Sequence, residues 1–108
     1  MECSSRQEGE FIIISLTGEV DLHYSPAARK EILDNLKNKN HVLVDLSGVD
    51  YIDSSGIASL VEGFQLARSQ DLKFGLVGVS TAARQVLELA RLDKVFQIRD
   101  NIADFVEN

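Results

Sequence analysis

The sequence predicts an α/β domain with a mixed, mostly parallel β-sheet of four to five strands packed with about four helices. Three observations support this fold class. Short β-branched runs alternate along the chain with stretches whose apolar residues recur every three or four positions. The runs are too apolar for one of their faces to lie in water, as in sheets covered on both sides. Each helical stretch also separates two strands, as parallel crossovers require.

The first half of the chain is predicted to contribute two core strands and one helix. Residues 11–16, FIIISL, form a β-branched run bounded by glycine-containing turns, and a poorer strand precedes them. Ser25 followed by Pro26 is typical of an N-cap and a first helical position. The apolar positions of this helix are Ala28, Ile32 and Leu36. Residues 41–46, HVLVDL, are the second core strand.

The second half repeats this alternation after a turn-rich stretch at 47–56. A helix is expected to begin near Ser55, with an apolar stripe at Ile57, Leu60, Val61, Phe64 and Ala67. Residues 72–77 form a third strand, and Ser80 is expected to cap the next helix. That helix carries Ala83, Val86, Leu89 and Ala90. A short strand at 95–98 and a terminal helix within 101–107 complete the prediction.

Size, charge and cysteine content limit the kinds of protein this chain can be. Its 108 residues predict one domain over 1–108. The net charge is −6, and no basic cluster exceeds Arg29-Lys30, which disfavours nucleic acid and anionic membrane surfaces as partners. The longest apolar run, 11–14, is too short to cross a bilayer. A single Cys3 and a polar first ten residues lead us to expect a cytoplasmic protein.

The sequence contains no convincing catalytic or metal site. A small hydrolase built on Ser54 and one of the two histidines is a poor option, because the nucleophile elbow Gly-x-Ser-x-Gly is absent. Residues 75–78 lack the dinucleotide fingerprint. No Cys or His pair has zinc spacing, and Asp50 with Asp53 is too few carboxylates for a calcium loop. We expect no enzyme activity, no cofactor and no metal.

The stretch Asp53-Ser54-Ser55-Gly56 follows a predicted strand and opens a helix, so it is the first place to look for function. A helix start exposes free N–H groups and a partial positive charge, which favour an anion such as phosphate. Gly56 would keep the first turn uncrowded for a large partner. A purely local interpretation is that these residues only form a turn and a cap.

Three motifs in order resemble the STAS domain of bacterial anti-sigma factor antagonists. They are the stretch LTGEVD at 16–21, the strand VLVDL at 42–46 and the stretch IDSSGI at 52–57. The resemblance extends from about residue 11 to residue 98. It implies a STAS-like fold and phosphorylation of the serine after the aspartate, which is Ser54 here. It also implies that Asp21 contributes to partner recognition, although a turn or cap role is an equal alternative.

The resemblance further implies a partner-switching function in transcription regulation. The unphosphorylated antagonist binds a partner that is both anti-sigma factor and serine kinase, the phosphorylated form releases it, and a serine phosphatase resets the cycle. An acidic partner surface would be repelled by the phosphate, which adds about −1.5 to −2 charges beside Asp53. The alternative is an adaptor STAS domain that docks constitutively in a transporter or signalling assembly, with Ser54 never phosphorylated.

One face of the second helix is a candidate docking surface. At 100° per residue, Ser55, Ser59, Glu62 and Leu66 fall opposite the apolar stripe, so we expect them to be exposed and to contact the partner. The predicted partner-binding set is Asp21, Asp53, Ser55, Gly56, Ser59, Glu62 and Leu66. Many relatives carry a glycine after the third helix, where this chain has residues 90–93, ARLD, so we expect a different cap there.

Overall fold

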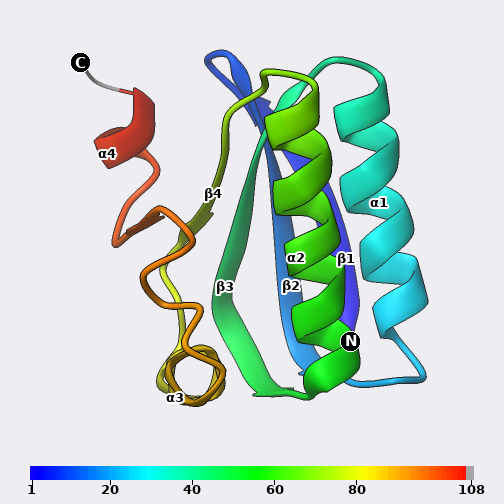
Figure 1. Ribbon diagram of the computed structural model, residues 1–108, viewed down its shortest axis with the longest axis vertical. Coiled ribbons are helices and arrows are strands. Elements are labelled where there is room, and N and C mark those ends of the chain that lie inside the picture. Colours follow the sequence, from blue (N-terminus) through cyan, green and yellow to red (C-terminus); the bar gives the residue numbers. More distant parts are fainter. Residues whose placement is uncertain (107–108) are drawn as a thin grey trace.

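A five-stranded sheet forms the centre of the molecule, whose computed structural model describes residues 1–106 (Figure 1). The strands lie side by side in chain order: β1 (Glu2–Glu8), β2 (Phe11–Val20), β3 (His41–Ile52), β4 (Phe74–Val77) and β5 (Ile98–Arg99). β1 is antiparallel to β2, and the other three pairings are parallel. The predicted mixed, mostly parallel sheet is confirmed, including the strand before residue 11.

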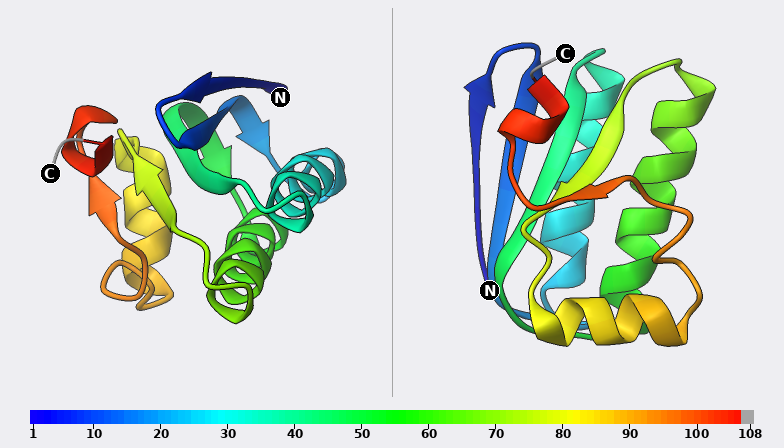
Figure 2. Two further views of the ribbon diagram at one scale, coloured as in Figure 1. Left: turned by 90° about the horizontal axis from the view of Figure 1, so that it is seen from above. Right: turned by 90° about the vertical axis from the view of Figure 1, so that its left-hand side faces the viewer.

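Two helices cover one face of this sheet, α1 (Ser25–Lys37) and α2 (Ser54–Ser69) (Figure 1). They connect β2 to β3 and β3 to β4, and right-handed crossovers between successive parallel neighbours place both helices on the same face. α3 (Thr81–Leu89) lies across the end of the sheet where α2 begins, and α4 (Ala103–Val106) lies on the other face (Figure 2). Within residues 1–106, no helix has the length and apolar character needed to span a bilayer.

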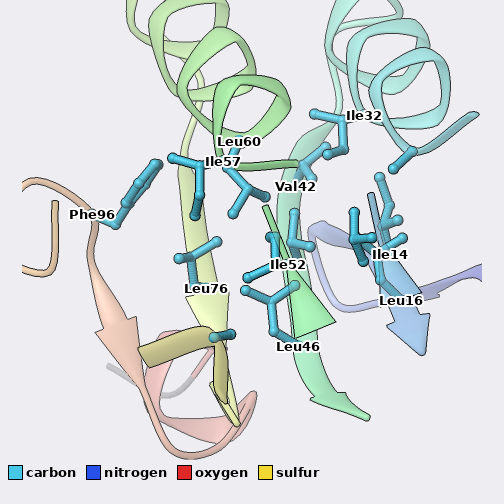
Figure 3. Close-up of a cluster of buried hydrophobic side chains, with 14 of the residues drawn as sticks. Ile14, Leu16, Ile32, Val42, Leu46, Ile52, Ile57, Leu60, Leu76 and Phe96 are labelled. Atoms are coloured by element: carbon cyan, nitrogen blue, oxygen red, sulfur yellow. The ribbon is translucent and has the colours of Figure 1, made fainter. Parts of the chain in front are cut away.

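The main core lies between the sheet and the two long helices (Figure 3). Ile14 and Leu16 of β2 point into it because alternate side chains of a strand share one face. Ile57 and Leu60, from the predicted apolar stripe of α2, belong to the same buried cluster (Figure 3). Full burial of one such aliphatic side chain stabilises the fold by about 1.5–3 kcal/mol. This core holds the first turn of α2 against the ends of β2 and β3.

β2 and β3 are longer than the sequence predicted. They were expected to end at 16 and 46, but they run to Val20 and Ile52, so six of the ten residues of the turn-rich stretch 47–56 are strand. Two register shifts, between Ser15 and Thr17 and between Gly18 and Glu19, let the backbones continue to pair. Position 48, beside the first shift, suits a glycine because a Cβ there would lie only 2.7 Å from Cγ2 of Thr17, which is too close. Backbone pairing, rather than an apolar pattern, extends these strands.

The start of α1 differs from the prediction. Tyr24 is the N-cap, Ser25 is the first helical residue and is buried, and no side chain caps this end by a hydrogen bond. Pro26 does lie in the first turn, as expected. The N–H of Tyr24 donates to Oδ1 of Asp21 at 3.1 Å, so the turn before the helix is held by a residue further upstream.

The third helix is capped as predicted but faces the core differently. The Oγ of Ser80 accepts from the N–H of Ala83 at 3.2 Å. Leu89, expected in the apolar stripe, is 85% exposed, and Ala90 lies beyond the helix. Leu87 is buried instead, because it lies four residues after the buried Ala83 and therefore on the same face of the helix. Leu89 lies about 200° round the helix from Leu87, on the opposite side.

The end of α3 is closed by the backbone pattern that a glycine usually adopts. Arg91 has a φ of 61°. Its N–H donates to the carbonyl of Glu88, and the N–H of Leu92 donates to the carbonyl of Leu87 at 2.8 Å. This is a Schellman motif with arginine in the left-handed position. The expectation of a different cap at 90–93 is therefore wrong.

The C-terminal elements are shorter than predicted. The third and fourth strands were expected at 72–77 and 95–98 and lie at 74–77 and 98–99, while the terminal helix expected within 101–107 spans 103–106. Residue 107 lies outside the described part of the chain. Phe105 of α4 packs against Phe11 on the sheet face that α1 and α2 leave open, with ring centroids 6.2 Å apart.

Candidate functional site

Asp53 joins the ends of the two central strands to the start of α2. It follows β3, its N–H donates to the carbonyl of Val20 at 3.3 Å, and its extended backbone makes it the N-cap of the helix. Its Oδ1 accepts from the N–H groups of Ser55 at 2.9 Å and Gly56 at 3.2 Å, and from the Ser55 hydroxyl at 2.5 Å. The cap expected at 53–56 is therefore present, with Asp53 as the capping residue.

The other carboxylate oxygen of Asp53 ties the cap to a distant loop. Its Oδ2 accepts from the N–H of Leu22 at 3.2 Å, so the loop between β2 and α1 is held beside the start of α2. The hydrogen bond from the Ser55 hydroxyl is the main cause that lowers the pKa of Asp53 below 3.8, and the backbone N–H groups of Gly56, Ser55 and Leu22 add to it. The carboxylate is thus kept ionised at the helix start.

Ser54 is the first residue of α2, and its side chain is exposed. In the described part of the chain, the side-chain hydrogen bonds at this helix start are made by Asp53 and Ser55. Ser54 is therefore an exposed serine without a side-chain hydrogen bond among the described residues. The start of α2 lies at the end of the sheet where β2 and β3 finish (Figure 1). An exposed hydroxyl in this position is accessible to a kinase.

Gly56 allows α2 to pack closely against the ends of the strands, and it does not open the outer surface of the helix to a partner. It is buried, and a Cβ there would lie 2.6 Å from Cγ1 of Ile52 and 2.8 Å from the carbonyl oxygen of Val20. The expectation that this glycine keeps the outer surface of the first turn open to a partner is wrong. It lets α2 begin in close contact with the strand ends.

The expected docking face of α2 is turned largely toward α1. Ser59 is only 4% exposed, and its hydroxyl donates to the carbonyl of Ser55 at 3.2 Å. Glu62 forms an ion pair with Arg29 of α1 at 2.9 Å. Leu66 is half-buried and packs against the core. The exposure predicted for Ser59 is wrong, because a second helix beside α2 could not be placed from the pattern of α2 alone, whereas the side chain of Glu62 is still 44% exposed.

Asp21 performs the local role that the sequence offered as one alternative. Its Oδ1 accepts from the N–H groups of His23 at 3.0 Å and Tyr24 at 3.1 Å, which closes the turn before α1. This turn and the Asp53 cap are linked through Leu22. Asp21 therefore lies in the loop beside Ser54, while a role in partner recognition remains a prediction.

The structure identifies exposed apolar residues at this end that sequence reasoning missed. Leu22 is 75% exposed although its backbone is fixed by Asp53. Tyr24 and Tyr51, from the same loop and from the end of β3, are 39% and 49% exposed. The available signal was a leucine between Asp21 and His23 in a polar loop. Exposed apolar side chains are typical of interaction sites where they form one contiguous patch, whereas single ones are common on protein surfaces.

The same end is acidic. The segments 19–24 and 50–56 contain the carboxylates of Glu19, Asp21, Asp50 and Asp53 and no lysine or arginine. Within residues 1–106, no group of three or more His, Cys, Asp or Glu side chains is arranged to hold a metal ion. The site combines one exposed hydroxyl, apolar side chains and negative charge, which are features of a protein-binding surface.

Known proteins resemble this chain along nearly its whole length. An anti-sigma-B factor antagonist of Listeria monocytogenes is 27% identical over 96 residues, which cover 87% of this chain and 83% of that protein. The anti-sigma-B factor antagonist of Bacillus subtilis is 22% identical over 93 residues, covering 86% and 85%. Both relatives are named anti-sigma-B factor antagonists.

Solved structures share the fold. A Thermotoga maritima crystal structure superposes with a TM-score of 0.88 at 24% identity, covering 97% of this chain and 92% of that one. The anti-sigma factor antagonist SpoIIAA, in its unphosphorylated form, gives a TM-score of 0.82 at 16% identity, covering 98% and 94%. The sequence pattern that defines the STAS domain matches residues 3–105. With the fold and the pattern in agreement, the chain belongs to the STAS domain family.

Proposed function

We propose that this protein is an anti-sigma factor antagonist that acts as a phosphorylation-controlled binding module. Unphosphorylated, it binds a protein that is both anti-sigma factor and serine kinase. Phosphorylation of Ser54 releases that protein, and a serine phosphatase restores binding. The names of the relatives support the antagonist role. The observation that supports the switch is the exposed hydroxyl at the first residue of α2. In this cycle the chain is a kinase substrate and not an enzyme.

The proposed docking surface consists of Ser54, the Asp21–Tyr24 loop and the exposed side of the first turn of α2. Leu22 supplies apolar area at its centre, where desolvation upon binding contributes most. Asp53 and Ser55 act by holding this loop and the helix start together. Ser59 is excluded from direct contact by its burial, and Leu66 contributes mainly to packing.

A phosphate on Ser54 would meet a helix start where the N–H groups of Ser55, Gly56 and Ile57 are already engaged. The N–H groups of Ser55 and Gly56 donate to Asp53, so the dianion must either displace that carboxylate or remain in solvent. The sequence had suggested that the helix terminus would accommodate the phosphate. With Asp53 in that place, a solvated phosphate projects toward the partner, and we expect the sheet itself to be unchanged.

Release then has a steric and an electrostatic component. The phosphate adds about −1.5 to −2 charges to a surface that already carries four carboxylates. A partner that binds this surface in the unphosphorylated state tolerates its negative charge. The size and hydration of the phosphate therefore cause most of the loss of affinity. Repulsion adds to this if the partner surface is acidic, and that part weakens as ionic strength rises.

Phosphate transfer followed by mass spectrometry tests the proposal. The protein is incubated with ATP and the anti-sigma factor/serine kinase of the same organism, and the intact mass and the modified peptide are measured. We expect one phosphate on the wild type and on Ser55→Ala, and none on Ser54→Ala. Ser55→Ala is the matched control because it changes the neighbouring hydroxyl of the same helix turn.

Binding measurements complete the test. Ser54→Ala should bind the kinase as the wild type does, and Ser54→Asp should bind at least about tenfold more weakly. A phosphate found only at another residue would remove Ser54 from the role. Equal binding by Ser54→Asp and Ser54→Ala, with no phosphate transfer, would instead favour a constitutive STAS adaptor.

A further inference from the structure

The sheet has an open edge beside the first half of β4. β5 pairs with β4 only at Leu76 and Val77, so within residues 1–106 no strand lies beside the first half of β4 on that side. The chain before β5 does not extend the pairing because it forms a turn there, in which the N–H of Phe96 donates to the carbonyl of Leu92 at 3.3 Å. The shortness of β5 therefore leaves this part of the edge uncovered.

Phe74 directs a hydrogen-bond donor and an acceptor to this open edge. The carbonyl of Lys73 accepts from the N–H of Val42 in β3 at 3.1 Å. The C=O and N–H of one trans peptide unit point in opposite directions, so the N–H of Phe74 points away from β3. The carbonyl of Phe74 points to the same side, because the two groups of one residue do so in an extended strand. Within residues 1–106, no turn or loop residue bonds to either backbone group. Unpaired backbone groups at a sheet edge are a template for another strand.

A hollow of about 510 Å³ lies beside this edge and has walls on both faces of the sheet. Phe64 of α2 lines it on the face that carries the two long helices, and Phe105 of α4 lines it on the other face (Figure 2). Both side chains are half-buried. Successive side chains of a strand point to opposite faces of a sheet. A strand added at this edge would therefore place alternate side chains against these two walls.

The hollow offers apolar contact without net charge. Val95 lines it and is 45% exposed, so an apolar group remains to be covered. Lys73, which also lines it, is paired with Glu10 at 3.1 Å. The other charged lining residues are two of each sign, namely Arg68, Arg99, Asp71 and Asp104. This balance favours a segment that itself carries no net charge.

We propose that the first half of β4 binds an extended, apolar segment of a partner protein, which adds a strand to the sheet. The main chain of the segment pairs with the N–H and C=O of Phe74, and its successive side chains contact Phe64 on one face and Phe105 on the other. Strands covered on both faces are nearly continuous apolar runs. The edge strand β1 of a second copy does not fit, because its sequence is the polar ECSSRQE.

This site is independent of the proposed switch. Ala67 and Arg68, which line the hollow, belong to the last turn of α2, whereas Ser54 is the first residue of that helix. At 1.5 Å per residue, the two ends are about 20 Å apart. The two surfaces can therefore be tested separately.

Amide hydrogen exchange of the purified full chain, followed by NMR, tests whether the edge is open and can be filled. In the free protein, the N–H of Phe74 should exchange at least about tenfold faster than that of Leu76, which donates to the carbonyl of Gln97 at 2.9 Å. The probe is a capped peptide of four valines with a lysine at one end and a glutamate at the other. At saturation it should slow exchange at Phe74 about tenfold and leave Leu22 unchanged.

Two control peptides separate backbone pairing from apolar contact. The first carries N-methyl groups on the two central valines, which removes main-chain donors and keeps the side chains. The second has serine in place of alternate valines, which leaves one face of the segment without apolar contact. Each should bind at least about fivefold more weakly than the probe in a shift titration.

Substitutions locate the site. Val95→Asp places a charge in the apolar part of the hollow and should weaken binding of the probe about tenfold. Leu89→Asp is the matched control, because Leu89 is 85% exposed on α3 and should leave binding unchanged. Urea unfolding of both variants verifies that the fold is intact. Ser54→Asp should bind the probe as the wild type does, so this result does not depend on the phosphorylation switch.

Three results would overturn the proposal. They are equal protection of Phe74 and Leu76 in the free chain, equal binding of the N-methylated peptide, and peptide-induced shifts that map to β1. Shifts at Phe74 that grow with the concentration of the chain alone would assign the edge to a second copy, which also contradicts a partner segment as its occupant.

Discussion

The carboxylate of Asp53 accepts a hydrogen bond from the N–H of Leu22 at 3.2 Å, across 31 residues of sequence. The same side chain caps α2 through Ser55 and Gly56. One carboxylate thereby fixes the position of the most exposed apolar residue in the loop beside Ser54. The geometry of the proposed docking surface therefore depends on Asp53, whose link to Leu22 the sequence did not predict.

Replacement of Asp53 should lower stability in a pH-dependent way. Hydrogen bonds lower the pKa of Asp53 in the folded state. The contribution of its carboxylate to folding stability is therefore complete above about pH 4 and is lost as the pH falls through the folded pKa. Asp53→Asn should therefore have a lower urea midpoint than the wild type at about pH 7, and the difference should shrink by about pH 2.5. Asp50→Asn, an exposed residue of β3, is the control. A difference that stays constant with pH would contradict this account.

Leu22 should be important for binding and unimportant for folding. Its side chain is 75% exposed, so Leu22→Ala removes little buried area, and the urea midpoint should be unchanged. Affinity for the kinase partner, measured by calorimetry, should fall about tenfold. Leu89→Ala is matched as a control, because Leu89 is 85% exposed but lies on α3 and outside the proposed surface. Equal losses for both variants would remove Leu22 from the docking surface.

Gly56 should be intolerant of a methyl group. In Gly56→Ala the new Cβ would lie 2.6 Å from Ile52 and 2.8 Å from the Val20 carbonyl oxygen, and forced overpacking of this kind costs about 1–3 kcal/mol. Denaturant unfolding measures the loss. Ala58→Gly, at an exposed position in the same helix, should cost only about 1 kcal/mol through helix propensity. An unchanged midpoint for Gly56→Ala would show that α2 moves freely away from the strands.

Arg91→Gly should stabilise the protein. Arg91 occupies the left-handed position of the Schellman motif with φ 61°, where a side chain costs about 1 kcal/mol and glycine does not. The greater freedom of glycine in the unfolded chain offsets part of this, so we expect a gain of about 0.5 kcal/mol. Ala90→Gly, where φ is −83°, should destabilise by up to about 1 kcal/mol. Thermal and urea unfolding of both variants give the comparison, and a loss with Arg91→Gly would contradict it.

Features held by local interactions could be predicted from sequence. The caps at Asp53 and Ser80 bond to N–H groups two or three residues ahead, so the residue types at that spacing are sufficient. The apolar stripe of α2 and the β-branched runs likewise determine which elements form and that the sheet is covered by helices. The motifs around Ser54 carried enough information to identify the family and the candidate serine.

Only the tertiary structure decided which surfaces remain exposed. α1 packs beside α2 and covers Ser59, and pairing between β2 and β3 extends both strands past their apolar runs. The Asp53–Leu22 hydrogen bond and the packing of Phe105 against Phe11 join residues that are far apart in the chain. Such contacts depend on the relative placement of whole elements, about which the periodicity within any one element carries no information. The sequence therefore determined which elements form and the caps at Asp53 and Ser80, and packing determined where the strands end and which side chains stay exposed.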